Sequence, residues 1–312
     1  MPRPSGGNCD RSKMRSFRSI TIVGLGLIGG SLAAACRKAF PRANIKGITR
    51  NPSALARAKK RGWIHEGYSD LNQAFARAGT RSPRPKQGGA TPPLPLIILC
   101  TPVDTLKNFL QQLDRLAPPG TVVTDTGSVK GFLVRWAERK KWKRIQFVGA
   151  HPLAGSHEQG FGAAREHLFD KALVFVTPGK RTSGRALGEV KEFWKKISRK
   201  VLVLSPELHD RLTAEISHFP HLLATLLVES VSPKSLQAAA SGFLDTTRIA
   251  QGDPNLWAPI LLENRLEINR VLKSFEGNLK RVQKILQDGK ISALKRLLDR
   301  SKKRRQALEI GV

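Results

Sequence analysis

A glycine-rich turn constrains the fold of this chain more than any other feature of its sequence. The turn consists of Gly24, Leu25, Gly26, Leu27, Ile28 and Gly29. It lies between a β-branched strand segment (19–23) and a predicted helix that ends before Pro41. In this context the first glycine permits a tight turn, the second lets a pyrophosphate approach, and the third lets helix and strand pack closely. The pattern predicts a dinucleotide site at the helix N-terminus, and a glycine-rich turn without a ligand is the alternative.

Predicted strands and helices alternate from residue 19 to residue 205. A second strand (44–49) and a second helix (52–62) follow the turn. Further strands are predicted at "LIILC", "TVVTD", "IQFVGA", "ALVFVTP" and "KVLVLSP". Alternation of this kind is typical of a parallel sheet with helices on both faces. We therefore predict an α/β fold with a Rossmann-type, doubly wound parallel sheet.

The sequence pattern changes after Ser205, where the strand signals stop. Ser205 suits the N-cap of a helix and Pro206 its first position. Apolar residues then recur at spacings of three and four, which indicates amphipathic helices. The first stripe is Leu208, Leu212, Ile216, Phe219, Leu223 and Leu226, and the second is Ile268, Leu272, Phe275, Leu279, Val282 and Leu286. We interpret the second stripe as a dimer interface, with burial inside the same chain as the alternative.

These patterns divide the chain into three predicted parts. Residues 1–16 are expected to be a disordered leader, residues 17–205 a dinucleotide-binding domain, and residues 206–310 an all-helical domain for substrate binding and dimerisation. Five prolines and three glycines in residues 79–95 predict a loop within the first domain.

The end of the second strand bears on the choice between NAD and NADP. An acidic residue at this place binds the 2′-hydroxyl of NAD in many Rossmann domains. This chain instead has Thr49 and Arg50 there. Arg50 is suited to pair with the 2′-phosphate of NADP, and an Arg that faces solvent is the alternative. We expect either cofactor to bind, with NADP slightly favoured.

Polar residues also follow three later strands at their carboxyl ends. They are Thr101 and Pro102 after one strand, Asp125, Ser128 and Lys130 after the next, and His151 after the third. Ligands of doubly wound sheets bind at these strand ends, so the three loops are expected to face one crevice. Because imidazole takes up a proton near neutral pH, His151 is the candidate acid–base residue, and a structural histidine is the alternative.

The helical half contributes a second set of candidates. Ser217, His218 and His221 lie within five residues, and Pro220 between the histidines is expected to disturb the helix locally. A metal site is disfavoured because no acidic or cysteine residues cluster nearby in the sequence. Arg248 is a candidate partner for a substrate carboxylate, and a surface ion pair is its alternative.

Composition excludes several classes of protein. The 54 basic and 24 acidic residues give a formal net charge of +30, but the basic residues are spread along the chain and are not interleaved with aromatics. Specific nucleic-acid binding is therefore disfavoured. No apolar run is long enough to cross a membrane. The three cysteines follow no disulfide or metal spacing, which favours free thiols in a cytoplasmic protein.

Taken together, the motifs resemble the prephenate/arogenate dehydrogenase family. The segments that carry the resemblance are "VGLGLIGGSLA", "CTPV", "DTGSVK", "GAHPLAGSHEQG", "ISHFPHLLATLL" and "GFLDTTRIAQGDPNLWAPILLEN". They occur in the family's order between residue 19 and about residue 280. The resemblance implies an NAD(P)-dependent dehydrogenase of tyrosine biosynthesis, and the second apolar stripe predicts that it acts as a homodimer.

The resemblance also implies roles for individual residues. His151 would accept a hydrogen bond from the ring hydroxyl of the substrate, Ser128 would orient His151, and Arg248 would pair with the ring carboxylate. The residues implied to line the substrate pocket are Ser217, His218, His221 and Trp257, the last of them from either subunit. His157 stands where some relatives carry Glu, so an acidic gate over the pocket is not carried over. Prephenate and arogenate differ only in a keto or amino group, and both remain open as substrates.

Overall fold

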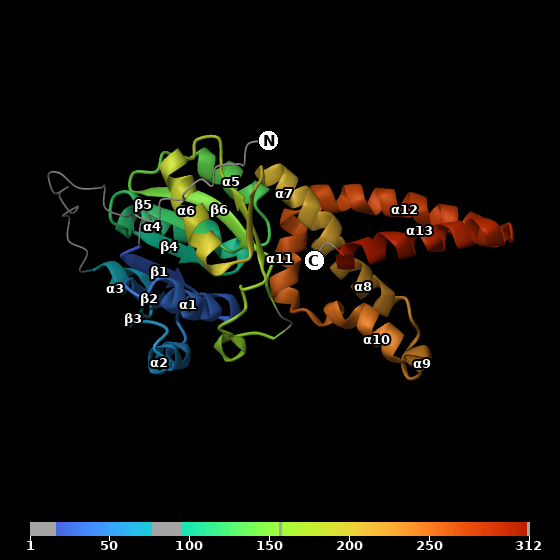
Figure 1. Cartoon of the computed structure of the whole chain (residues 1–312), viewed down its shortest axis with the longest axis horizontal. Helices are drawn as coiled ribbons and strands as arrows, with labels where there is room; N and C mark the ends of the chain where they lie inside the picture. The colour runs from blue at the N-terminus through green and yellow to red at the C-terminus, as the bar shows by residue number, and fades with distance from the viewer. Residues whose placement is uncertain (1–16, 77–94, 156–157, 311–312) are drawn as a thin grey trace, which may run out of the picture.

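The computed structural model describes residues 17–76, 95–155 and 158–310 of the chain. The expected leader, most of the proline-rich loop, Cys9 and His157 lie outside these residues. Figure 1 shows a sheet with helices on both faces, followed by helices that extend away from it.

The first part of the chain forms one eight-stranded sheet. Its strands are β1 (Ser19–Val23), β2 (Asn44–Ile48), β3 (Glu66–Tyr68), β4 (Leu96–Leu99), β5 (Thr121–Asp125), β6 (Ile145–Pro152), β7 (Leu173–Thr177) and β8 (Lys200–Val203). They lie in the order β3-β2-β1-β4-β5-β6-β7-β8. The order reverses between β1 and β4, which is the switch point where such sheets bind ligands. The Rossmann-type fold expected from the sequence is confirmed.

Two strands, β7 and β8, run against the direction of the parallel sheet that we expected. β7 runs antiparallel to β6, with His151 opposite Phe175, and β8 runs parallel to β7. A parallel neighbour requires a crossover, usually a helix. The described residues between β6 and β7 contain only the short turn η3 (Phe161–Ala163), whereas the helix α6 connects β7 to β8. The connection therefore decides the direction of β7.

Helices cover both faces of the sheet. They are α1 (Leu27–Ala39), α2 (Pro52–Lys60), α3 (Leu71–Phe75), α4 (Leu106–Leu116), α5 (Gly131–Glu138) and α6 (Gly184–Ile197). In β4, Leu96 and Ile98 pack in the core that includes α1 and α6, while Ile97 and Leu99 pack in the core that includes α4 and α5. Because side chains alternate along a strand, a strand buried on both faces is apolar throughout, as "LIIL" is.

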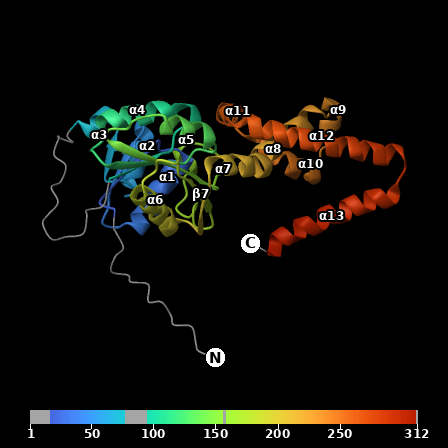
Figure 2. The same cartoon turned by 90° about the horizontal axis from the view of Figure 1, so that it is seen from above.

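The second part is helical, as expected. Its elements are α7 (Pro206–Thr213), the π-helical turn η4 (Ala214–His218), α8 (Phe219–Glu229), α9 (Pro233–Leu236), α10 (Ser241–Thr247), η5 (Arg248–Gln251), α11 (Pro254–Glu263), α12 (Arg265–Gln287) and α13 (Ile291–Ile310). The Ser205 hydroxyl accepts a hydrogen bond from Leu208 N, which confirms the predicted N-cap. Helices α12 and α13 project from the sheet as a hairpin that turns at Gly289 (Figures 1 and 2).

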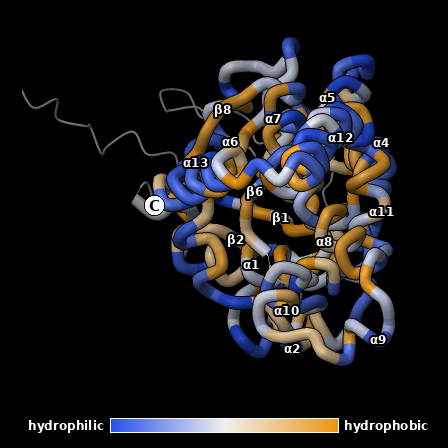
Figure 3. The backbone as a smooth tube through the Cα atoms, turned by 90° about the vertical axis from the view of Figure 1, so that its right-hand side faces the viewer, coloured by the Kyte–Doolittle hydropathy of each residue, from blue (hydrophilic) through white to orange (hydrophobic). Residues whose placement is uncertain are grey.

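The two apolar stripes are only partly covered within one chain. In the first stripe, Ile216 is 60% exposed, and in the second Leu286 is 61% exposed. Ile268, at the start of the second stripe, is buried. Figure 3, which faces the helical end, shows hydrophobic and hydrophilic residues alternating along these helices. A large part of their apolar surface is thus left open to a further contact.

Two other expectations concern membranes and cysteines. None of the helices in the described part of the chain is both long and apolar enough to span a bilayer. Cys36 is a buried free thiol in α1, and Cys100, which follows β4, is a partly buried one.

Candidate active site

The glycine-rich turn has the geometry of a phosphate site. Gly24 has a φ of +91°, which side chains disfavour, and a Cβ added there would lie 2.5 Å from the Cys100 carbonyl oxygen. A Cβ at Gly29 would lie 1.8 Å from the carbonyl oxygen of Gly24. Gly26, by contrast, is the N-cap of α1 and has nothing within 4 Å of its Cβ position. The turn therefore leaves open space in front of the N-terminus of a 13-residue helix, which suits a pyrophosphate.

The neighbouring strand ends frame this turn. Thr101 and Pro102 follow β4, and the Thr101 methyl group lies 3.0 Å from the Cβ position of Gly24. Thr49 and Arg50 follow β2, where the Thr49 hydroxyl accepts a hydrogen bond from Asn51 N at 3.3 Å. The Arg50 side chain is exposed, so its guanidinium is open to an anionic ligand.

A buried ion pair holds the next two strand ends together. Asp125, at the end of β5, pairs with Lys130, and both side chains are fully buried. Asp125 also accepts a hydrogen bond from Ala150 N at 3.1 Å, and Lys130 Nζ donates to the Ala150 carbonyl at 3.0 Å. These contacts tie the loop that carries Ser128 to the end of β6. Asp125 and Lys130 are therefore structural supports of the site.

His151 lies at the end of β6 and is 8% exposed. Its Nδ1 is hydrogen-bonded to His209 Nε2 at 2.9 Å, and His209 Nδ1 to Asp210 Oδ1 at 2.8 Å. Ser128, the expected partner, makes no hydrogen bond with His151 within the part of the chain that the structure describes. His209 and Asp210 were not among the predicted site residues, because the spacing of apolar residues in α7 predicts that its opposite face is buried.

Asp210 connects the two parts of the chain. Its carboxylate accepts hydrogen bonds from Lys130 N and Gly131 N, both at 2.8 Å, at the N-terminus of α5. Its main-chain carbonyl accepts from Asn264 Nδ2, also at 2.8 Å. The helical part is therefore anchored to the strand ends at the residue next to His209.

Asn264 also determines where His218 carries its proton. A carbonyl only accepts, so the atom facing Asp210 O is the amide nitrogen of Asn264. The same nitrogen lies 2.9 Å from His218 Nδ1, which must then accept. His218 consequently has its proton on Nε2, and this buried atom has no hydrogen-bond partner among the described residues.

The other predicted pocket residues gather around His218. The His221 ring stacks on Trp257 of the same chain, with centroids 3.7 Å apart, and a Cβ at Gly252 would lie 2.5 Å from Trp257 Nε1. Ser217 and His218 lie in the π-helical turn two residues before Pro220, where we expected a disturbance of the helix. Such turns are frequent at functional sites. In the described part of the chain, no His, Cys, Asp and Glu residues cluster as a metal site.

Arg248 begins the turn η5, which packs on α8, the helix of His221. Its side chain is exposed and makes no ion pair or hydrogen bond with any residue that the structure describes. The surface ion pair that we considered as the alternative is thus not formed with those residues. The guanidinium remains available to an anion beside α8.

Burial keeps the histidines of the site uncharged. It lowers the pKa of His209 to about 2 and of His218 to about 4, and nearby positive charge on Lys130 adds to the effect at His209. The pKa of His151 also lies well below its usual value, because of burial first and then of His209, Lys130 and His218. Neutral imidazoles are both donors and acceptors, so their hydrogen bonds decide which role each one takes.

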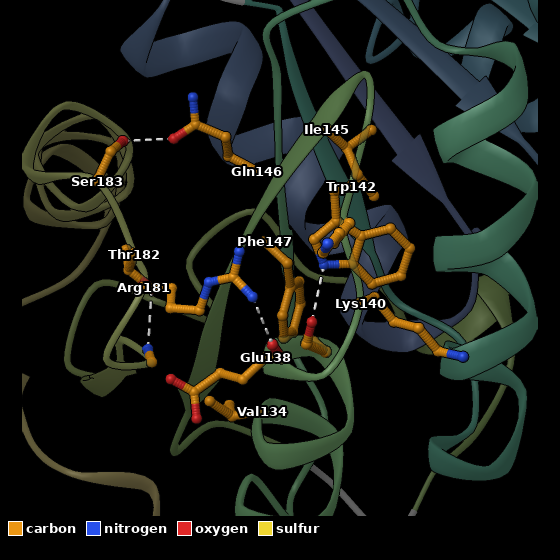
Figure 4. A pocket seen from close by; sticks show the side chains of 13 residues that line it. Val134, Glu138, Lys140, Trp142, Ile145, Gln146, Phe147, Arg181, Thr182 and Ser183 are labelled. Carbon is orange, nitrogen blue, oxygen red and sulfur yellow. Dashed lines mark hydrogen bonds between the residues drawn. The ribbon is translucent and has the colours of Figure 1, made fainter.

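A separate cavity of about 430 Å³ lies at the other end of β6 (Figure 4). Its lining includes Trp142, Ile145, Gln146 and Arg181, and Arg181 donates to the Glu138 carbonyl at 3.2 Å. It contains none of the residues predicted from the sequence. The buried histidines described above therefore lie at the carboxyl end of β6, away from this cavity.

Comparison with known proteins agrees with this arrangement. The family model for the nucleotide-binding domain of prephenate dehydrogenase matches residues 88–203, and the model for its dimerization domain matches residues 205–300. Prephenate dehydrogenase of Bacillus subtilis (strain 168) is 36% identical over 277 residues, which cover 86% of this chain and 69% of that protein.

Two solved structures extend the comparison. Prephenate dehydrogenase from A. aeolicus, in complex with hydroxyphenyl propionate and NAD+, is 31% identical with a TM-score of 0.83, covering 95% of this chain and 100% of that one. Synechocystis arogenate dehydrogenase is 27% identical with a TM-score of 0.74, covering 92% and 99%. This chain therefore belongs to the prephenate dehydrogenase family and is an NAD(P)-dependent dehydrogenase.

Proposed function

We propose that the chain oxidises prephenate to 4-hydroxyphenylpyruvate and CO2 in tyrosine biosynthesis. The observation that carries this proposal is the buried His151 at the carboxyl end of β6, which is hydrogen-bonded to His209 and whose pKa lies well below its usual value. A dinucleotide on the turn would place its nicotinamide near the strand ends that carry Ser128 and His151.

The reaction requires one residue to accept a proton and others to hold two carboxylates. Bound NAD(P)+ supplies the hydride acceptor. His151 accepts the proton of the ring hydroxyl as hydride leaves the same carbon, and loss of the ring carboxylate as CO2 makes the ring aromatic. The proton then returns to the ring oxygen, so no net proton is released. Arg248 pairs with the carboxylate that is lost, and the Nε2–H of His218 donates to a polar group of the substrate.

The unsatisfied nitrogens support a polar ligand in this pocket. Burying an imidazole N–H without a partner is unfavourable by a few kcal/mol at most sites. His218 Nε2 and His221 Nδ1 are both buried without a partner in the described part of the chain. A carboxylate or keto oxygen of the substrate would satisfy the Nε2–H of His218. Ser217, on the same turn as His218, would line the pocket beside them.

Arogenate is the second candidate substrate, since it differs from prephenate only in one amino group and the similar Synechocystis protein is an arogenate dehydrogenase. The deciding experiment crosses both substrates with both cofactors and follows NAD(P)H and CO2 together. We expect turnover with at least one pair, prephenate being the better substrate. Absence of turnover with all four pairs would reject the assignment.

We also propose that the enzyme favours NADP over NAD, with NAD tolerated. Arg50 is exposed at the end of β2 and no acidic residue follows that strand to repel a 2′-phosphate. A charge-assisted contact there would favour NADP by roughly 10–100-fold. The ratio of catalytic efficiencies for NADP and NAD is therefore expected to fall toward one in Arg50→Ala, while Lys60→Ala, an exposed change at the far end of α2, leaves it unaltered. A wild type that prefers NAD, with a ratio indifferent to Arg50, contradicts the proposal.

A homodimer through the helical part is the last element of the proposal. The exposed leucines of α12 need cover, and the matching family model is that of a dimerization domain. Light scattering at micromolar concentration is expected to give twice the mass of the chain. Leu279→Glu should shift the mass toward the monomer, and Ser274→Glu, an exposed polar site on the same helix, should not. A monomeric wild type would disprove the dimer.

Two further expectations from the sequence complete the proposal. We take residue 205 as the boundary between the two domains, and the cytoplasm as the location of the protein.

A further inference from the structure

Three buried side chains form a continuous hydrogen-bonded chain that ends at His151. Asp210 and His209 lie next to each other on α7, and His151 lies 58 residues before His209 on β6. The two hydrogen bonds measure 2.8 and 2.9 Å, and the side chain of His209 is fully buried. The His209 ring also packs edge-on against His151 and Phe175, which holds its plane.

The direction of these hydrogen bonds follows from Asp210. Burial raises the pKa of the Asp210 carboxyl, but both of its oxygens accept from main-chain N–H groups, those of Lys130 and Gly131. These hydrogen bonds need an acceptor at each oxygen and favour the ionised form, as does the charge of Lys130. A carboxylate can only accept, so His209 must donate from Nδ1. The opposite arrangement would place the lone pair of Nδ1 against a carboxylate oxygen in a buried site, which is unfavourable.

The same reasoning determines which ring nitrogen of His151 carries the proton. A neutral His209 with its proton on Nδ1 has a lone pair on Nε2. That lone pair faces His151 Nδ1, which must therefore carry the proton and donate it. His151 is left with a lone pair on Nε2, the nitrogen that is free to face a ligand.

We propose that Asp210 and His209 are positioning residues that hold His151 in the tautomer with its proton on Nδ1, so that Nε2 accepts the proton of the substrate hydroxyl. The inference rests on the proposed role of His151 in the reaction. When His151 takes up that proton, His209 accepts a stronger hydrogen bond from the imidazolium, and the Asp210 carboxylate lies one ring further away. The other titratable groups whose charges act on His151 or His209 are Lys130 and His218, and neither is hydrogen-bonded to either ring.

The tautomer can be measured without any turnover. Long-range proton–nitrogen spectra of enzyme labelled with 15N-histidine distinguish protonated from unprotonated ring nitrogens. The chain has seven histidines, and the signals of His151 are those absent from His151→Asn. At neutral pH we expect protonated Nδ1 and unprotonated Nε2 for His151 in the ligand-free wild type. A proton on Nε2, or an average of the two tautomers, would overturn the proposal.

Variants of His209 test the consequence for catalysis. His209→Phe removes the acceptor and is expected to lower kcat by ~10–100-fold, to change the KM for the dinucleotide little, and to give His151 mixed tautomers. His209→Gln keeps an oxygen near the position of Nε2 and should retain most of the activity and the tautomer. His167→Gln, at an exposed histidine paired with Asp170, is the matched control.

The outcomes separate this proposal from the proposed function. If His209→Phe keeps both the wild-type kcat and the single tautomer of His151, the positioning role is refuted. If His209→Phe does not fold, the tautomer of His151 in the wild type and the activity and tautomer of His209→Gln still test the positioning role. An enzyme that shows the expected tautomer but turns over neither prephenate nor arogenate retains the positioning of His151 and refutes the proposed function.

Discussion

Replacing His151 with asparagine is expected to lower the turnover number by ~10²–10⁴-fold, the usual contribution of a positioned acid–base group. Asparagine preserves a donor near the position of Nδ1, so the hydrogen bond to His209 is retained while the lone pair of Nε2 is lost. Dinucleotide affinity should remain nearly unchanged, because the glycine-rich turn joins β1 to α1 and does not include β6.

The measurements are steady-state kcat with the preferred substrate and titration of the cofactor by fluorescence. His167→Asn serves as the control, since His167 is exposed and lies outside the site. Two results would remove His151 from the mechanism: wild-type turnover in the variant, or loss of activity that is explained entirely by loss of the cofactor.

Replacing Arg248 with glutamine is expected to raise the KM for the substrate by about 10- to 100-fold, with a smaller effect on kcat. The guanidinium has no ion-pair partner in the part of the chain that the structure describes, and η5 packs against the helix that carries His221. An interaction with a carboxylate that is present both before and during the reaction contributes mainly to binding.

Arg115→Gln is the matched control, because Arg115 is an exposed arginine on α4, which covers the sheet. It removes the same charge from a molecule with a net charge of +30, so it corrects for any general electrostatic attraction of an anionic substrate. If both variants raise KM equally, Arg248 acts only through that general field. If neither does, Arg248 is a surface residue without a role in the site.

Local sequence patterns were enough to predict much of the architecture. The dinucleotide turn requires glycine at Gly24 for its left-handed φ and at Gly29 for its close approach to the Gly24 carbonyl, both of them within the turn itself, and the structure reproduces both. The N-cap at Ser205 and the disturbance near Pro220 are likewise local, since each depends on the hydrogen bonds of a single turn. The polar strand ends also followed from sequence, because parallel strands direct their carboxyl ends to one edge.

Contacts between distant parts of the chain determine the strand direction and the side-chain pairing that local patterns do not predict. The direction of β7 depends on the connection that follows β6, and an apolar segment such as "LVFVT" suits either direction. The stacking of His221 on Trp257 joins α8 to α11, which no short segment of sequence contains.

The polar face of α7 is buried by contacts with residues that lie far away in the sequence. Its periodicity favoured burial of the face with Leu208, yet Leu208 is 42% exposed, whereas His209, Asp210 and Thr213 are buried. A polar face can be buried only where partners satisfy it, and here they are His151, Lys130 N and Gly131 N, between 58 and 80 residues away in sequence. The sequence alone determined that His151 stands at a strand end beside a dinucleotide turn. Only the tertiary structure decided which nitrogen of His151 is left to accept a proton, because that depends on hydrogen bonds between groups that the chain brings together from different elements.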